Sequence, residues 1–269
     1  MEQDRTHNPF ILLILFLHKH TMKKFFALAA MAAMFIACGG EKPTPHPQPQ
    51  PVPGEGDEQV ESAIKVDGQF DDWAALDASK VVSVALNEEE GTYKYSDLKL
   101  VKVYADELSI NLYVEFDPIQ AMNFGLFIDA DFDETTGRNT PWRGVELYFE
   151  GSIYEWLEEN EAFVEQLGGL AWTPGLFQFA GADDTDEWNW TELVAGGIAT
   201  ASTPAAVGEF AAVEISVMRE MIAYDLAETV GLGFTVANNG WNNCGVLPQV
   251  STEAEETGEV AHMLEVALP

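Results

Sequence analysis

Residues 108–116 read Leu-Ser-Ile-Asn-Leu-Tyr-Val-Glu-Phe, with an apolar side chain at every second position. In an extended chain, successive side chains point to opposite faces, so this alternation collects the apolar ones on a single face. The pattern is typical of an antiparallel strand that packs one face on a core and leaves the other face in water. The segment therefore predicts a fold built on antiparallel sheet.

Similar short segments recur on both sides of this strand. Residues 145–150 and 211–218 alternate in the same way. Further strands are predicted at 81–86, 98–105, 124–130, 176–180, 198–201, 231–237 and 260–266. About ten short strands separated by turn residues predict an all-β fold, an antiparallel β-sandwich of the jelly-roll or immunoglobulin-like type. One or two short helices are expected, at 155–167 and 218–228.

The composition supports a folded domain and disfavours some partners. The chain has 269 residues, of which 47% are hydrophobic and 11% aromatic. This is enough to build one large core. Asp and Glu number 45 against 13 Lys and Arg, which gives a formal net charge of -32. Because phosphate binding needs clustered basic side chains, the sequence predicts no nucleic-acid partner, and it disfavours binding to anionic membrane surfaces.

The first 37 residues have the composition of a targeting segment. Residues 22–38 read MKKFFALAAMAAMFIAC, a short basic start, an apolar run and small residues before Cys38. This resembles a bacterial lipoprotein signal peptide, whose final cysteine receives the lipid. The alternative is an ordinary secretory signal or a membrane anchor, although the run is short for a span. Residues 1–21 then fit a start assigned too early, with Met22 as the true first residue.

Residues 38–63 are predicted to be a tether. After Cys38 they are rich in Pro, Gly and polar residues, which favour extended chain and cannot bury apolar surface. The remaining residues, 64–269, are predicted to form a single domain. If Cys38 is acylated, Cys244 is the only other cysteine, so no disulfide within the chain is expected. We expect an exported, lipid-anchored protein of the cell envelope, attached to the membrane through its lipid only.

The densest chemistry lies between two predicted strands. Asp129, Asp131 and Asp133 stand at alternate positions and are followed by Thr135 and a turn-forming glycine. Carboxylate and hydroxyl oxygens are the ligands that calcium prefers, and calcium tolerates irregular geometry. The loop follows a strand and lacks the final glutamate of an EF-hand, so we expect a strand-to-loop calcium site. Glu146, on the outward face of the next strand, is a further candidate ligand.

The alternative for this loop is a solvated acidic turn without an ion, which is common in acidic chains. A second acidic segment, residues 183–187, is less regular, and for it ion binding and a plain solvated loop are equally good interpretations. Without a cation, repulsion opposes the packing of neighbouring carboxylates. The predicted calcium ion is therefore structural.

Several stretches, in their order along the chain, resemble one family. They are IKVDGQFDDW at 64–73, VKVYADEL at 101–108, GVELYF at 144–149, AVEISV at 212–217 and VGLGF at 230–234. Together they resemble the carbohydrate-binding module family 9-like sandwiches, which belong to the wider DOMON-like group, and they span nearly all of the predicted domain. The resemblance implies a β-sandwich that binds glycan. In such modules the opening Asp-Gly turn and Trp73 are mainly structural, so Trp73 is predicted to lie in the core.

Exposed tryptophans among amides favour sugar binding, because indole rings stack on the C–H faces of sugars while amides bond the hydroxyls. The resemblance implies a pair of tryptophans that clamp a terminal sugar, but the motifs do not align those rings to single positions. Trp241, flanked by amides that include Asn239 and Asn242, is the first candidate. Trp142, beside Arg143, is the second. The alternative is that these rings only cover one end of the sandwich.

No motif of a nucleophilic, metal-dependent or phosphate-binding enzyme occurs in the chain. Of the five histidines, only His262 lies beyond residue 46. A haem site of the DOMON type is also disfavoured, because it needs axial Met or His ligands. We therefore expect a protein that is not an enzyme.

Two functions follow from these observations. The first is an envelope-anchored lipoprotein whose calcium-stabilised sandwich binds carbohydrate, beside neighbouring proteins that handle polysaccharide. The second is an adhesion or structural module that binds protein and has no sugar site. Exposed tryptophans in a polar cleft would favour the first function, and a flat apolar patch would favour the second.

Overall fold

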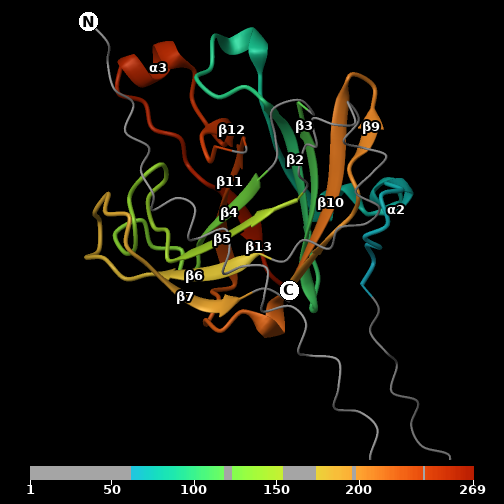
Figure 1. Cartoon of the computed structure of the whole chain (residues 1–269), viewed down its shortest axis with the longest axis horizontal. Coiled ribbons are helices and arrows are strands. Elements are labelled where there is room, and N and C mark those ends of the chain that lie inside the picture. The colour runs from blue at the N-terminus through green and yellow to red at the C-terminus, as the bar shows by residue number, and fades with distance from the viewer. Residues whose placement is uncertain (1–61, 118–122, 154–173, 196–197, 239) are drawn as a thin grey trace, which may run out of the picture. The chain divides into compact units, whose positions relative to one another are not determined.

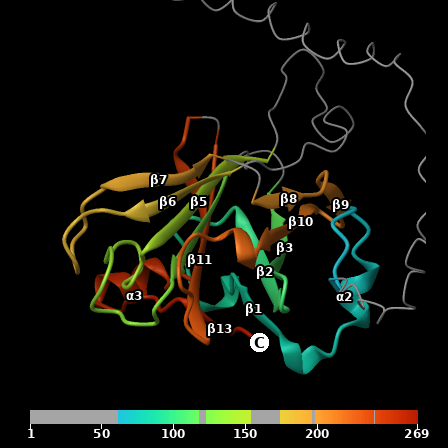
Figure 2. The same cartoon turned by 90° about the horizontal axis from the view of Figure 1, so that it is seen from below.

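The computed structural model describes residues 62–117, 123–153, 174–195, 198–238 and 240–269. These residues belong to one compact unit and form two packed β-sheets, seen edge-on as two layers in Figure 2. The predicted all-β sandwich is confirmed. Residues 1–61, which include Cys38, the predicted signal peptide and nearly all of the predicted tether, lie outside the described residues. No helix in the described ranges is long and apolar enough to cross a membrane.

The first sheet has the order β1-β2-β3-β10-β8, with β9 paired to β10 (Figure 1 and Figure 2). Its strands are β1 (Val81–Ala85), β2 (Leu98–Ala105), β3 (Ser109–Phe116), β8 (Ala199–Ala201), β9 (Ala205–Val207) and β10 (Phe210–Met218). The second sheet has the order β12-β11-β4-β5-β6-β7, with β13 paired to β11. Its strands are β4 (Asn123–Asp129), β5 (Leu147–Ser152), β6 (Gly175–Phe179), β7 (Trp190–Ala195), β11 (Thr229–Ala237), β12 (Asn243–Leu247) and β13 (Leu264–Ala267). All pairs between these strands are antiparallel.

The alternating segment at 108–116 forms β3, a central strand between β2 and β10. The core between the sheets buries the even-numbered apolar residues of β3, which are Ile110, Leu112, Val114 and Phe116. The prediction that its other face meets water is wrong. Tyr113 on that face is buried against Phe70 and Trp73. Phe70 directly precedes the helix α2 (Asp71–Ala75), and Trp73 lies within it. The residues that cover this face are distant in the sequence, so the alternation within the strand could not predict that the face is buried.

The remaining helical elements are short. They are α3 (Thr252–Glu256) and the 3-10 turns η1 (Ala78–Lys80), η2 (Glu88–Glu90) and η3 (Arg219–Met221). The helix predicted at 218–228 is therefore wrong apart from η3, and the helix predicted at 155–167 lies entirely outside the described residues. The strands β7, β9 and β12 were not predicted, because they are short or rich in polar residues and glycine.

Candidate functional site

The outer face of the second sheet carries the candidate site. In β4, Phe124, Leu126 and Ile128 point into the core between the sheets. The residues between them therefore face outward, and Asp129 and Phe127 lie in one row on that face. On the neighbouring strand β5, Tyr148 lies opposite Phe127 in the strand register. Acidic and aromatic groups thus follow one another along the same face.

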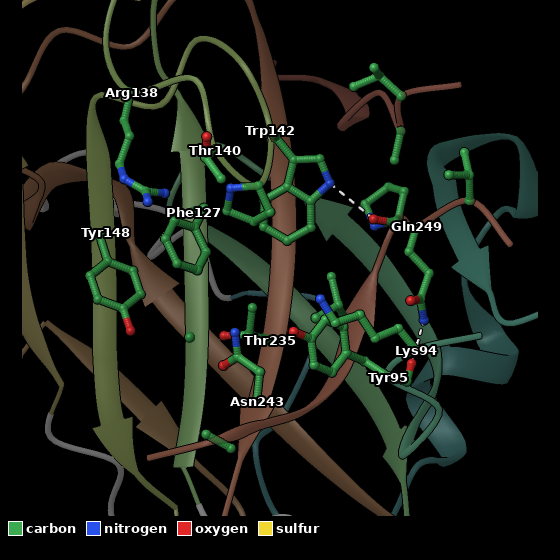
Figure 3. A pocket seen from close by; sticks show the side chains of 18 of the residues that line it. Lys94, Tyr95, Phe127, Arg138, Thr140, Trp142, Tyr148, Thr235, Asn243 and Gln249 are labelled. Carbon is green, nitrogen blue, oxygen red and sulfur yellow. Dashed lines mark hydrogen bonds between the residues drawn. The ribbon is translucent and has the colours of Figure 1, made fainter. Parts of the chain in front are cut away.

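A cavity of about 870 Å³ opens on this face. Its floor is formed by outward residues of β4, β5 and β11, and its walls by segments from other parts of the chain, and Figure 3 labels residues of both. The polar groups that line it include Lys94, Asn123, Arg138, Glu150, Thr235, Asn243 and Gln249. Apolar floor and scattered polar groups are the usual make-up of a small-molecule site.

Aromatic rings form much of the cavity. Phe127 and Tyr148 are stacked, with ring centroids 4.3 Å apart. Trp188 meets Tyr148 edge-on at 5.6 Å. The hydroxyl of Tyr148 donates to Glu150, and burial together with this carboxylate raises the pKa of Tyr148.

Trp142 lines the cavity but is only 1% exposed. Its indole lies over Gly233, where an added Cβ would come within 2.5 Å of the ring. The indole N–H donates to the carbonyl oxygen of Pro248 at 3.0 Å. Trp142 thus supports the wall, and its ring offers no open face for a sugar.

Two tryptophans in the described chain are exposed, and both line this cavity: Trp188 is 61% exposed and Trp241 is 55% exposed. Trp241 has a φ of 60°, a left-handed conformation that is unfavourable for a bulky residue. A tight turn holds it there, because the Asn238 side chain accepts from the backbone N–H groups of Gly240 and Asn242. Strain of this kind is concentrated at functional sites.

Of the other predicted sugar-binding residues, Asn242 and Arg143 do not direct their side chains to a shared site with Trp241. Asn242 is exposed and its amide is used within the turn, donating to Gly240. Asn239 lies outside the described residues. Arg143 lines a separate cavity of about 580 Å³, together with Asp129 and the paired side chains of Glu134 and His262.

Arg138 and Trp188 belong to the site but were not predicted. The Arg138 Nε donates to the carbonyl oxygen of Glu187 at 3.1 Å, and Nη2 donates to that of Asp186 at 3.4 Å. The guanidinium carbon lies 5.0 Å from the centre of the Trp188 ring. The available signals were a single arginine in an acidic loop and a tryptophan in a polar segment. Nothing in the sequence indicated that these two segments meet.

A group of three carboxylates lies at the end of the same strands. One oxygen from each of Asp129, Asp131 and Glu146 lies within 4.8 Å of the others. Asp129 and Glu146 are buried, and burial raises the pKa of Asp129 to about 6 and that of Glu146 to about 7. The backbone N–H of Ala130 donates to Glu146 at 2.7 Å, and the hydroxyl of Thr136 donates to it at 2.9 Å. Three predicted ligands are thus brought together.

The two remaining predicted ligands bond each other instead. The Asp133 carboxylate accepts from the backbone N–H and the hydroxyl of Thr135, at 2.9 and 2.6 Å. The second acidic segment folds against this loop, since Asp183 accepts from the backbone N–H of Gly137 at 3.1 Å. Burial raises the pKa of Tyr224, and the negative charges of Glu146, Asp131 and Asp183 raise it further.

No protein-family model matches the chain, and no curated protein sequence matches it. The resemblance to the family 9-like modules therefore stays a prediction, and the function is argued from the geometry of the site.

Proposed function

We propose that the protein is a lipid-anchored envelope protein whose β-sandwich binds carbohydrate without catalysing a reaction. The observation that carries the proposal is the cavity of about 870 Å³ that holds both exposed tryptophans of the described chain. Trp188 and Trp241 offer flat apolar faces for sugar rings. Amide, hydroxyl and charged groups around them supply the donors and acceptors that sugar hydroxyls need. Neighbouring proteins that handle polysaccharide are the proposed functional partners.

The test is calorimetric titration of the full-length protein, in a detergent without a sugar headgroup, with cellobiose, xylobiose and N,N′-diacetylchitobiose. We expect at least one probe to bind. Trp188→Ala and Trp241→Gly should each weaken binding about fivefold or more, because stacking on an aromatic ring is worth on the order of 1 kcal/mol or more. Glycine is chosen at position 241 because it accepts the left-handed backbone without strain.

Phe210→Ala is the matched control. Phe210 is also an exposed aromatic residue, 37% exposed, but it lies in the first sheet and does not line the cavity. Binding of no probe, or equal losses in the control, would contradict a sugar site in this cavity and favour a protein-binding module.

We also propose that Asp129, Asp131 and Glu146 hold a structural calcium ion. Their ligand atoms are all carboxylate oxygens, which suits a hard cation. In the described ranges no Lys or Arg forms an ion pair with any of the three. Two buried carboxylates with raised pKa values therefore gain a counter-charge if a cation binds.

Thermal unfolding with calcium and with EDTA tests this ion. A ligand at 100 times its Kd stabilises by about 2.7 kcal/mol, so excess calcium should raise the Tm clearly over EDTA. Asp131→Asn should abolish the difference, and Asp133→Asn, a neighbouring exposed carboxylate outside the group, should keep it. Equal Tm values in calcium and EDTA would instead identify a solvated acidic turn.

A further inference from the structure

Arg138 is a buried cation in the wall of the cavity. The residue is 8% exposed, and two backbone carbonyls hold its Nε and Nη2. In the described chain, Nη1 has no hydrogen-bond partner, although it is shielded from water. Figure 3 shows the guanidinium reaching down from its loop toward Phe127 and Tyr148. Two hydrogen bonds thus hold the guanidinium in the wall of the cavity and leave Nη1 as an unused donor.

An unused buried donor is costly. Leaving such a group without a partner costs about 1–3 kcal/mol, and more when it is charged. Most buried polar groups are therefore bonded to protein or water. A ligand oxygen that accepts a hydrogen bond from Nη1 would remove this penalty. The unpaired Nη1 therefore gives the ligand a specific anchoring point.

The charges around the cavity indicate what kind of oxygen fits. Three carboxylates line the cavity, Glu150, Glu255 and Glu259, against two cations, Lys94 and Arg138. The whole chain carries a net charge of -32. A second negative group from a ligand would meet repulsion from these carboxylates and from the field of the whole molecule. Hydroxyl, ring or amide oxygens accept from Arg138 without that penalty.

We propose that Arg138 anchors the ligand by donating from Nη1 to an oxygen of an uncharged sugar, and that the cavity rejects sugars that carry a carboxylate. This rests on the proposed function of the cavity. The ring of Trp188 lies over the guanidinium, so a sugar that reaches Nη1 shifts this ring. Arg138 sets the orientation of the sugar, and Trp188 contacts its apolar face.

The experiment compares neutral and acidic probes on the full-length protein. Calorimetry with the best neutral disaccharide from the panel above is set against digalacturonic acid, at the same ionic strength. Arg138→Lys keeps the positive charge but lacks the planar group that holds Nη1 in place. We expect it to weaken binding of the neutral sugar about 10- to 100-fold, the range for a hydrogen bond from a charged donor. Digalacturonic acid should bind at least tenfold more weakly than the neutral probe to the unmodified protein.

Tryptophan fluorescence provides a second measurement. If the sugar reaches Arg138, the emission of Trp188 should change on binding, because its ring lies over the guanidinium. Binding of the neutral sugar should change the tryptophan emission, and Trp188→Phe, which keeps a ring over the guanidinium, should remove the part of that change that comes from Trp188. This measurement stands even if Arg138→Lys does not fold, because it leaves Arg138 in place.

The outcomes separate this inference from the proposed function. If no sugar binds the unmodified protein, both fail. If sugar binds and depends on Trp241, but Arg138→Lys keeps full affinity or the Trp188 signal is unchanged on binding, the role of Arg138 is overturned and the sugar site stands. Stronger binding of digalacturonic acid than of the neutral probe would overturn the assignment to uncharged sugars.

Discussion

Glu214 joins two of the sequence stretches that first indicated a family resemblance. It is fully buried in β10, where one carboxylate oxygen accepts from the backbone N–H groups of Asp67 and Gly68, at 3.1 and 2.8 Å. The other oxygen accepts from the indole N–H of Trp73 at 3.1 Å. Trp73 is 8% exposed, which confirms its predicted place in the core. The opening turn and the later Val-Glu strand are thus two halves of one hydrogen-bonded unit.

This carboxylate predicts a pH dependence of stability. Burial raises the pKa of Glu214 above its ordinary value of 4.5, despite the three donors. The native state then holds the proton more tightly than the unfolded state, so the contribution of Glu214 to stability falls as the pH rises from about 4.5 through the native pKa. Urea unfolding of the unmodified protein and of Glu214→Gln should show a stability difference that shrinks with rising pH. A difference that is constant from pH 4 to pH 8 would contradict this account.

At the scale of elements, β11 is built differently on its two faces. Its inward residues, Val230, Leu232, Phe234 and Val236, are all in the core. Its outward positions include Gly233, which has no side chain and therefore leaves room for the indole of Trp142 to lie on the sheet. One strand therefore stabilises the sandwich and makes room for the wall of the cavity.

Gly233→Ala tests this arrangement. The new methyl group would collide with an indole that is fixed by its bond to Pro248. Overpacking of this kind costs about 1–3 kcal/mol. We expect urea unfolding to show that loss, together with a shifted tryptophan emission as Trp142 moves. An unchanged free energy of unfolding would mean that Trp142 can shift away from the new methyl group without loss of stability.

The same elements show how far the sequence predicts the structure. The strand β3 was predicted because its alternation is local and long. The strand β12 was not predicted, because it begins with Asn243, Cys244 and Gly245 and only its last two residues are clearly apolar. The acidic group was predicted in part, since its ligands are close in sequence. The partnership of Arg138 with Trp188 could not be predicted, because it depends on how two loops about 50 residues apart meet.

At the scale of the whole molecule, charge is the dominant feature. The net charge is -32, and the described part of the chain contains two ion pairs, Lys99 with Glu88 and Glu134 with His262. Repulsion among unpaired carboxylates therefore opposes the compact state. Salt shortens the reach of this repulsion, from about 30 Å at 0.01 M to about 10 Å at 0.1 M.

Sodium chloride should therefore stabilise the protein. We expect the Tm, measured with EDTA present, to rise between 10 and 150 mM salt by about 2–4 °C for each 1 kcal/mol of repulsion that is screened. EDTA ensures that the effect does not come from a bound divalent ion. A Tm that falls with added salt would show that attractive charge pairs prevail.

The glycines beneath the cavity also offer a handle for protein engineering. At Gly125, an added Cβ would meet the hydroxyl of Thr235 and lie 3.1 Å from the Tyr148 ring. The cavity is thus as deep as it is because Gly125 in its floor has no side chain. Pairing Gly125→Ala with Thr235→Ala would exchange bulk between adjacent strands and remove the clash with the Thr235 hydroxyl, so that only the Tyr148 ring has to shift. Such compensated swaps provide a way to retune ligand size while the core between the two sheets stays untouched.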